Sequence, residues 1–180
     1  MEIKPWLTAI NRNKISAPLK HVINHNHINK SHRILDYGCG HGFDLNYLKD
    51  SGFNIIGYDK YIKKFSSETF KNCKYDIVLC YYVLNVIEDY EERILALKEM
   101  VDLLDNKGII YLAVRSVDEL NPFKNSKFLK HKDGIVTKKN TFQKYFSKDD
   151  FANLISNIEN CTYEYLPFNN KTLFIKIKKI

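Results

Sequence analysis

Hydrophobic positions along the chain switch between two periods, and the switches predict strands that alternate with helices. Short apolar runs over 33–36, 54–58, 75–82 and 109–114 have the length and aliphatic content of strands buried on both faces. Over 89–104 the apolar residues instead recur at helical spacing, with charged residues on the opposite face. This order of elements predicts an α/β protein with a mainly parallel sheet and helices on both faces.

Capping residues predict the remaining helices. Ser16, followed by a proline in the first turn, favours a helix through about residue 23. Residues 44–49 with Gly52 beyond them predict the first crossover helix, because glycine suits the left-handed conformation that ends a helix. Ser147 predicts the start of a helix through about residue 157.

The last part of the chain predicts an antiparallel hairpin after a long insertion. Residues 162–166 and 172–178 alternate apolar and polar side chains, and Asn169-Asn170 between them suits a tight turn. Residues 117–146 form a basic and aromatic stretch without a clear period. We interpret this stretch as a substrate-facing insertion, since long loops in compact domains are usually functional or disordered.

Composition favours a single folded domain. The chain has 180 residues, of which 44% are hydrophobic and 13% aromatic, as is typical of a globular protein with one core. We expect one domain over 1–180, in which residues 1–33 form an N-terminal helical lid. No apolar run is long enough to cross a bilayer, and the N-terminal segment lacks the apolar core of a signal peptide, so we expect a cytoplasmic protein without membrane contact.

Cysteine and histidine spacing does not indicate a metal site. The four cysteines are scattered without a C-x-x-C pair, so neither a disulfide framework nor a zinc knuckle is predicted. His21, His25, His27 and His32 have spacings that fit no standard metal site. We therefore expect no metal.

The stretch Ile34–Asp59 contains the candidate chemistry. It carries Asp36-Tyr37-Gly38-Cys39-Gly40-His41-Gly42 between a predicted strand and a predicted helix, and Asp59 ends the next strand. Glycine lets the backbone turn tightly and lets a ligand lie against the main chain at the start of a helix. The spacing differs from the dinucleotide pattern G-x-G-x-x-G, since Phe43 stands at the third glycine position. A nucleoside-binding βαβ unit is predicted.

This Asp-x-Gly-x-Gly-x-Gly pattern resembles motif I of the class I S-adenosylmethionine-dependent methyltransferases. The resemblance implies a Rossmann-like fold, S-adenosylmethionine as the methyl donor and S-adenosylhomocysteine as the product. It places the methionine end of the cofactor on the backbone of Gly38, Cys39 and Gly40. It places Asp36 near the cofactor amino group, or in a bracing role, and Asp59 on the ribose.

The same resemblance completes the expected cofactor-binding set with Arg12, Asp44, Lys60, Cys80 and Tyr81. Asp44 has a second explanation, because a negative charge is favourable on the first turn of a helix. Residues 60–75 are too few for the helix, strand and helix that the resembled fold places there. We therefore expect its third strand to be reduced or absent.

Methyl transfer from a sulfonium is an in-line displacement, so the protein mainly has to position the two reactants and exclude water. His41 in the glycine loop is a candidate general base for an acceptor hydroxyl or amine, although an idle exposed loop residue would look the same. Tyr81 and Tyr82 follow a predicted strand at the place beside the reactive methyl. One would pack against the cofactor and the other would line the acceptor pocket, unless both are ordinary strand-end aromatics.

Three stretches taken together resemble the methyltransferases associated with DNA phosphorothioation gene clusters. They are Asn11-Arg12 with Ser16-Ala17-Pro18, Leu35-Asp36-Tyr37-Gly38-Cys39-Gly40-His41-Gly42, and Tyr82-Val83-Leu84-Asn85-Val86-Ile87-Glu88-Asp89 with Glu92-Arg93. The chain departs from that group at His41, where the group tends to have arginine, and the group usually extends beyond this chain's end. The resemblance therefore strengthens the enzyme class more than the acceptor.

Charge indicates an anionic partner without identifying it. The net charge of +7 and the pI near 9.1 suit nucleic acid, although abundant Lys, Asn and Ile are also expected from an AT-rich genome. Our leading hypothesis for the acceptor is a nucleic acid or nucleotide. The alternatives are a small-molecule O- or N-methyltransferase and a protein that binds S-adenosylmethionine without turnover.

The insertion supplies the residues for the nucleic-acid hypothesis, because its lysines alternate with aromatic residues. Lysines neutralise phosphates and aromatic rings stack on bases, a combination suited to single-stranded or flipped nucleotides. A solvated lysine-rich loop with a few aromatic residues in the core would give the same pattern. The lysines are Lys124, Lys127, Lys130, Lys132, Lys138, Lys139 and Lys144, and the aromatic residues are Phe123, Phe128, Phe142, Tyr145 and Phe146.

Overall fold

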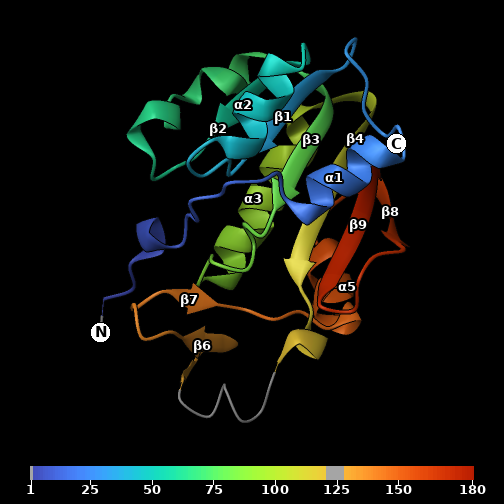
Figure 1. Cartoon of the computed structure of the whole chain (residues 1–180). Helices are drawn as coiled ribbons and strands as arrows, with labels where there is room; N and C mark the ends of the chain where they lie inside the picture. Colours follow the sequence, from blue (N-terminus) through green and yellow to red (C-terminus); the bar gives the residue numbers. More distant parts are fainter. Residues whose placement is uncertain (1, 121–127) are drawn as a thin grey trace.

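The computed structural model describes residues 2–120 and 128–180, and it contains a six-stranded sheet of order β2-β1-β3-β4-β9-β8 (Figure 1). The first four strands in this order are parallel to one another. β9 pairs antiparallel with β4 on one side and with β8 on the other. The strands are β1 (Arg33–Tyr37), β2 (Asn54–Tyr58), β3 (Tyr75–Tyr81), β4 (Leu104–Arg115), β8 (Cys161–Leu166) and β9 (Thr172–Lys179). The predicted α/β fold with a C-terminal hairpin is confirmed.

Helices cover both faces of this sheet, as the pattern predicted. The helices are α1 (Ala17–Asn24), α2 (Phe43–Asp50), α3 (Tyr90–Leu103) and α5 (Lys148–Ile155). Buried residues of α1 and α2 form one core cluster with one side of the sheet, and buried residues of α3 and α5 form the other cluster. A hydrophobic core therefore lies on each face of the sheet, and the ends of the strands are left available for a ligand-binding site.

Residues between β2 and β3 form no strand. They contain two short 3-10 helices, η2 (Lys63–Phe65) and η3 (Glu68–Asn72), and β2 is the edge strand of the sheet. The expected reduction of the third strand is thus confirmed. Phe70 of η3 is buried and packs against the rings of Tyr37 and Tyr58, so η3 closes the core where a further strand would otherwise lie.

Local capping explains where the helices begin. The Ser16 side chain accepts a hydrogen bond from Leu19 N–H at 3.2 Å, and Ser147 forms a reciprocal capping box with Asp150. The predicted helix over 89–104 is one residue shorter at each end, because Asp89 is its N-cap and β4 begins at Leu104. Residues 106–108, which follow the end of the helical pattern, lie inside the span of β4.

The described part of the predicted insertion is not a loop. Residues 128–146, here called the cap, contain a three-stranded antiparallel sheet. Its strands are β5 (Leu129–His131), β6 (Gly134–Val136) and β7 (Phe142–Gln143). Strands of two or three residues are too short to produce a period in the sequence. Residues 121–127, with Phe123, Lys124 and Lys127, lie outside the described residues.

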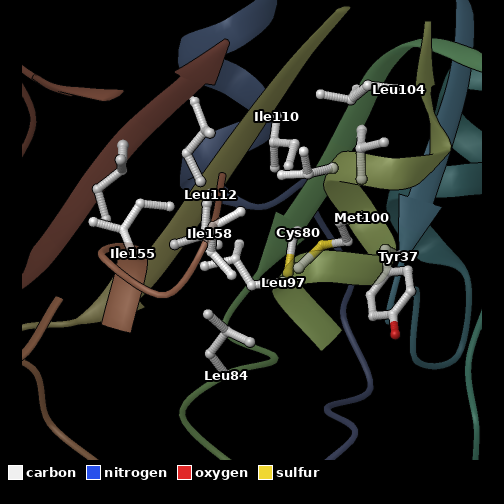
Figure 2. Packing of buried hydrophobic residues seen from close by; sticks show 14 of the residues in the cluster. Tyr37, Cys80, Leu84, Leu97, Met100, Leu104, Ile110, Leu112, Ile155 and Ile158 are labelled. Atoms are coloured by element: carbon white, nitrogen blue, oxygen red, sulfur yellow. The ribbon is translucent and has the colours of Figure 1, made fainter. Parts of the chain in front are cut away.

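The core beside α3 shows how β3 divides its side chains between the two faces. Cys80 is fully buried among Leu97 and Met100 of α3 and Leu112 of β4 (Figure 2). Tyr81, the next residue, packs on the other side with the cluster that includes α1. Successive strand residues point to opposite faces, so only one of these two neighbours can belong to each core. Among the helices of the described residues, none is long and apolar enough to cross a membrane.

Candidate cofactor and acceptor cleft

A large cleft of about 1340 Å³ opens at the carboxyl ends of the parallel strands. Pockets for single ligands are typically about 300 to 1000 Å³, so this cleft has room for two molecules. Its wall includes almost the whole predicted site, namely Arg12, Asp36, Gly38, Cys39, Gly40, His41, Asp44, Asp59, Lys60, Tyr81 and Tyr82. The fold therefore brings together residues from the first half of the chain that are up to 70 positions apart.

The glycine loop after β1 has backbone conformations that favour glycine. Gly38, Gly40 and Gly42 have φ values of +80°, +55° and +82°. A Cβ at Gly38 would overlap the side chain of Val83, so the loop and the segment after β3 are in direct contact. The N–H groups of Gly38 and Cys39 both donate to Tyr58 O, at 2.7 and 3.0 Å. These bonds tie the loop to the end of β2.

Asp59, at the end of β2, braces the same loop. One carboxylate oxygen accepts a hydrogen bond from Gly40 N–H at 2.9 Å. The other oxygen accepts from Tyr61 N–H at 2.9 Å and Ile62 N–H at 3.2 Å. A carboxylate can accept about four hydrogen bonds, so Asp59 retains capacity for a ligand hydroxyl while it holds the loop.

Three carboxylates converge on this end of the cleft. Asp36 is only 5% exposed, and its burial, together with the negative charges of Asp44 and Asp59, raises its pKa to about 8 even though Arg12 acts in the opposite direction. Asp44 accepts a hydrogen bond from Ser16 N–H at 2.9 Å, which links the start of α2 to the start of α1. A cationic ligand would relieve the repulsion among these acids.

Tyr81 and Tyr82 lie where β3 ends, and both line the cleft. The Tyr81 hydroxyl is buried and has no hydrogen-bond partner among the described residues. Burial, followed by the nearby charge of Asp36, raises the pKa of Tyr81 well above its ordinary value. Tyr82 has a φ of +63°, which is unusual for a residue with a side chain, and its hydroxyl lies 3.1 Å from Thr172 Oγ1.

Other predicted site residues have different environments. His41, Arg12 and Lys60 are exposed at the cleft wall. Cys39 also lines it, and burial raises the pKa of its thiol, so the sulfur is kept as a neutral thiol. Cys80 does not line the cleft, because its side chain points into the core beside α3.

One wall of the cleft lies N-terminal to α1, within the predicted lid over 1–33. The N-terminal arm, defined here as residues 3–12, passes over the glycine loop, with Ala9 Cβ 3.7 Å from the position a Cβ on Gly40 would take. Lys4 N–H donates to Asn140 O at 2.7 Å, which joins the arm to the cap. Figure 1 shows the arm running from beside β7 to α1 across the strand ends. In the predicted lid over 1–33, α1 belongs to the core, and the arm is the part that lines the cleft.

The cleft fits S-adenosylmethionine on three observations. The side-chain-free glycine loop leaves backbone open to a ligand, the three acids complement a cofactor that carries ammonium and sulfonium groups, and the unpartnered Tyr81 hydroxyl is a free donor. When bound, this cofactor supplies a methyl group activated by attachment to a sulfonium.

Solved structures share this fold. A methyltransferase dependent on S-adenosylmethionine from Clostridium acetobutylicum matches with a TM-score of 0.67 at 12% identity, over 93% of each chain. One from Methanosarcina mazei matches with a TM-score of 0.61 at 16% identity, over 87% of this chain and 94% of that one. The 1,6-didemethyltoxoflavin-N1-methyltransferase of Burkholderia thailandensis, solved with its substrate and S-adenosylhomocysteine, matches with a TM-score of 0.61 at 15% identity, over 91% and 78%.

The sequence itself gives the family. No curated protein matches the chain. The model of a methyltransferase domain family matches residues 10–158, which include the glycine loop, Asp59 and the end of β3. The chain belongs to this methyltransferase domain family and is a methyltransferase that uses S-adenosylmethionine.

Proposed function

We propose that this enzyme methylates a small molecule bound in the cleft beside Tyr82, where β3, β4 and β9 meet. The observation that carries the proposal is the mixed charge of the cleft wall, which is not the basic groove that a nucleic-acid backbone requires. Nine acidic residues and seven lysines or arginines line it. The acids are Asp36, Asp44, Asp59, Glu68, Glu88, Glu92, Glu99, Asp102 and Glu119, and the bases are Arg12, Lys60, Lys71, Lys74, Lys98, Arg115 and Lys171.

The cap gives the second support, because several residues of its lysine and aromatic pattern have structural roles. Phe142 and Phe146 are 0% and 2% exposed, so these rings are not open to stacking on a base. Lys144 is buried and pairs with Asp150 at 3.1 Å. Lys132 pairs with Glu88 at 3.0 Å. The alternative of a lysine-rich segment with its aromatic residues in the core describes this part of the chain better.

In the proposed reaction the chain holds the methyl donor and the acceptor in line. The backbone at Gly38 and Gly40 holds the methionine end of the donor, Asp36 faces its ammonium, and Asp59 accepts hydrogen bonds from its ribose. Once bound in this way, the donor would present its activated methyl group to the acceptor nucleophile. His41 accepts the proton that an O–H or N–H acceptor loses.

Tyr82 is the residue that we assign to the acceptor. Its strained φ of +63° persists because its N–H donates to Ala113 O at 2.8 Å and its hydroxyl bonds with Thr172. Strained backbone is costly and is retained mainly at functional positions. Tyr81, with its buried hydroxyl, belongs on the donor side of the reacting atoms. In this arrangement both aromatic rings help to exclude water from the transfer.

A nucleic acid is the second candidate acceptor. Lys130, Lys138 and Lys139 are exposed on the cap, so a cationic surface lies near the arm that lines the cleft. The resemblance to the phosphorothioation-associated methyltransferases supports the same candidate, as a hypothesis about the subtype of the enzyme. The nucleic-acid acceptor and this subtype both require that the enzyme recognise a phosphate backbone.

Labelled methyl transfer separates these possibilities. The purified enzyme is incubated with methyl-labelled S-adenosylmethionine and with DNA, RNA and low-mass metabolite fractions from the same lysate. We expect label in the low-mass fraction with the wild type and none with Asp59→Ala. Label in DNA or RNA would overturn the proposal in favour of the second candidate. A protein that binds S-adenosylhomocysteine but labels no fraction would be a binding protein without turnover.

A further inference from the structure

One wall of the cleft is a loop whose shape is not set by its own secondary structure. This wall, here called the post-β3 loop, comprises residues 82–88, and Tyr82, Val83, Val86, Ile87 and Glu88 all line the cleft. Its internal backbone bonding includes Val86 N–H to Val83 O at 3.0 Å, a single turn. Val83 packs directly on Gly38, so a shift of the loop would move the floor of the cofactor site.

Asn85 fixes the middle of this loop. The residue is fully buried and satisfies its polar groups with two distant segments. Its side-chain amide donates to Lys144 O at 2.6 Å, and its side-chain carbonyl accepts from Arg115 N–H at 3.1 Å. Its backbone carbonyl accepts from Lys144 N–H at 2.7 Å. Asn85 therefore joins the loop to the end of β4 and to the cap.

Arg93 fixes the end of the same loop from the first turn of α3. Its guanidinium, only 1% exposed, donates to Ile87 O at 2.8 Å and to Glu88 O at 3.1 Å. The remaining donors form a two-point ion pair with Asp133 of the cap, at 2.5 and 2.8 Å. The rings of Phe142 and Phe146 lie 5.5 and 6.0 Å from the guanidinium carbon. An arginine buried in this way requires its anionic partner.

Asp133 is the informative member of this network, because it belongs to the cap and does not line the cleft. Without its carboxylate, the Arg93 guanidinium would keep its charge in a buried site with two donors unpaired. It would then move toward solvent or another acceptor and release the carbonyls of Ile87 and Glu88. The contact between Val83 and Gly38 would be lost with the shape of the loop.

We propose that Asn85 and Arg93 are positioning residues that hold the cofactor-facing wall in its binding shape, and that Asp133 controls cofactor affinity through Arg93. The cap is on this view a fixed support of the cofactor site rather than a surface for the acceptor. The inference rests on the S-adenosylmethionine site and not on the identity of the acceptor.

Calorimetry with S-adenosylhomocysteine tests the proposal on the full chain. Asp133→Asn keeps the size of the side chain and removes its charge, and we expect the dissociation constant to rise about threefold to tenfold, as for other mutations along a coupling network. Asp133→Glu, which restores the charge, should recover part of the affinity. Asp149→Asn is the matched control, because Asp149 is an exposed acid on α5, and its affinity should equal that of the wild type.

A second control separates positioning from general loss of stability. Ser147→Ala removes the N-cap of α5 and lowers stability without touching the post-β3 loop. At a temperature where both variants are folded, Ser147→Ala should bind S-adenosylhomocysteine normally and Asp133→Asn should not. Hydrogen exchange should be faster at 82–88 in Asp133→Asn alone. If Asp133→Asn does not fold, Arg93→Lys serves instead, since lysine keeps the charge but cannot reach both carbonyls and Asp133 together.

Two outcomes would overturn the inference. One is wild-type affinity in a folded Asp133→Asn or Arg93→Lys protein, and the other is an equal loss of affinity in Ser147→Ala. Neither outcome depends on the acceptor. Methyl label found in nucleic acid would refute the proposed function while leaving the S-adenosylhomocysteine measurements as they stand.

Discussion

The glycine loop and the cap support the same cleft, and they are specified in different ways. The loop, at 38–42, follows β1 directly, and its shape comes from positive φ angles at three glycines. The cap, at 128–146, is held by the pair between Arg93 and Asp133, which lie 40 positions apart, and by bonds from Asn85 to a residue 59 positions away. Backbone chemistry fixes the first region, and long-range polar contacts fix the second.

This difference has a consequence for substitutions. In the glycine loop, the sensitive positions are those where a Cβ cannot be accommodated, whatever its polarity. In the cap, the sensitive positions are charged or polar groups whose partners are buried, and side-chain size matters less. Substitutions that separate these two dependences are therefore the sharpest tests of the comparison.

The largest effect is expected at Gly38. In Gly38→Ala the new Cβ meets Val83 in a backbone conformation with φ of +80°, so both strain and overlap oppose folding. Strain of about 1 to 2 kcal/mol and overpacking of about 1 to 3 kcal/mol give a loss of about 2 to 5 kcal/mol. Urea unfolding measures this loss, and calorimetry should show little or no binding of S-adenosylhomocysteine.

Gly40→Ala is the matched control, because Gly40 also has a positive φ, of +55°, but space for a Cβ. Its cost should be the strain alone, about 1 to 2 kcal/mol. Equal losses of stability in the two variants would show that overlap with Val83 is unimportant. The contact between the glycine loop and the post-β3 loop would then not couple the two regions.

An intermediate effect is expected from Asp36, just before the glycine loop, and Asp133, in the cap. The pKa of the Asp36 carboxyl is raised and that of the Asp133 carboxyl is lowered. Burial, and then the charges of Asp44 and Asp59, raise the pKa of Asp36 from 3.8 to about 8. Its contribution to stability is therefore complete below pH 3.8 and is lost as the pH rises to about 8. For Asp133, burial raises the pKa. The hydrogen bonds and charge of Arg93, with the charge of Lys144, together lower it by more, so the net shift of the pKa is downward. Its contribution is present above the ordinary pKa and is lost as the pH falls.

Asp36→Asn should consequently stabilise the free protein at high pH while weakening cofactor binding. The difference in free energy of unfolding between variant and wild type should grow as the pH rises toward about 8, because the wild-type carboxyl ionises more readily in the unfolded chain than in the folded one. Denaturant unfolding at several pH values, with Asp133→Asn in parallel, measures both trends. Parallel pH profiles for wild type and Asp36→Asn would contradict the raised pKa.

Most of the fold could be predicted from local patterns. The bounds of β2 agree with those predicted, and the start of α1 followed from Ser16, an N-cap residue whose side chain accepts a hydrogen bond from the N–H of Leu19. The absent third strand followed from the small number of residues over 60–75, compared with the elements that the resembled fold places there. These features depend on period, capping and spacing, which a single sequence contains.

The short strands of the cap and its contact with the arm could not be predicted in the same way. Strands such as β7, with two residues, have no period, and a hydrogen bond like that from Lys4 to Asn140 involves backbone that every residue carries. Arg93 lies on a helix whose other charged residues are exposed or half-buried, so the helical pattern did not indicate a buried cation, although the resemblance to the phosphorothioation-associated group includes this residue. The resemblance to class I methyltransferases placed both Cys80 and Tyr81 with the cofactor, yet the two side chains point to opposite faces of β3.

The smallest effect is expected from the exposed lysines of the cap. Lys138 and Lys139 lie on the turn between β6 and β7, and neither forms an ion pair within residues 2–120 and 128–180. Replacing both with alanine should change the free energy of unfolding by less than about 0.5 kcal/mol, as is usual for exposed positions. The affinity for S-adenosylhomocysteine should also be unchanged, because these side chains do not line the cleft.

The same double variant also tests nucleic-acid binding, through the salt dependence of the affinity for DNA or RNA. Each phosphate that a protein neutralises adds about 0.7 to 0.9 to the slope of log affinity against log salt. For a small-molecule enzyme we expect neither the wild type nor the variant to bind single-stranded DNA or RNA with such a slope. If the wild type binds and the double variant lowers the slope by about 1.4 to 1.8, both lysines contact phosphates. The cap would then be a nucleic-acid surface as well as a support of the cofactor site, and its exposed lysines would be its functional part.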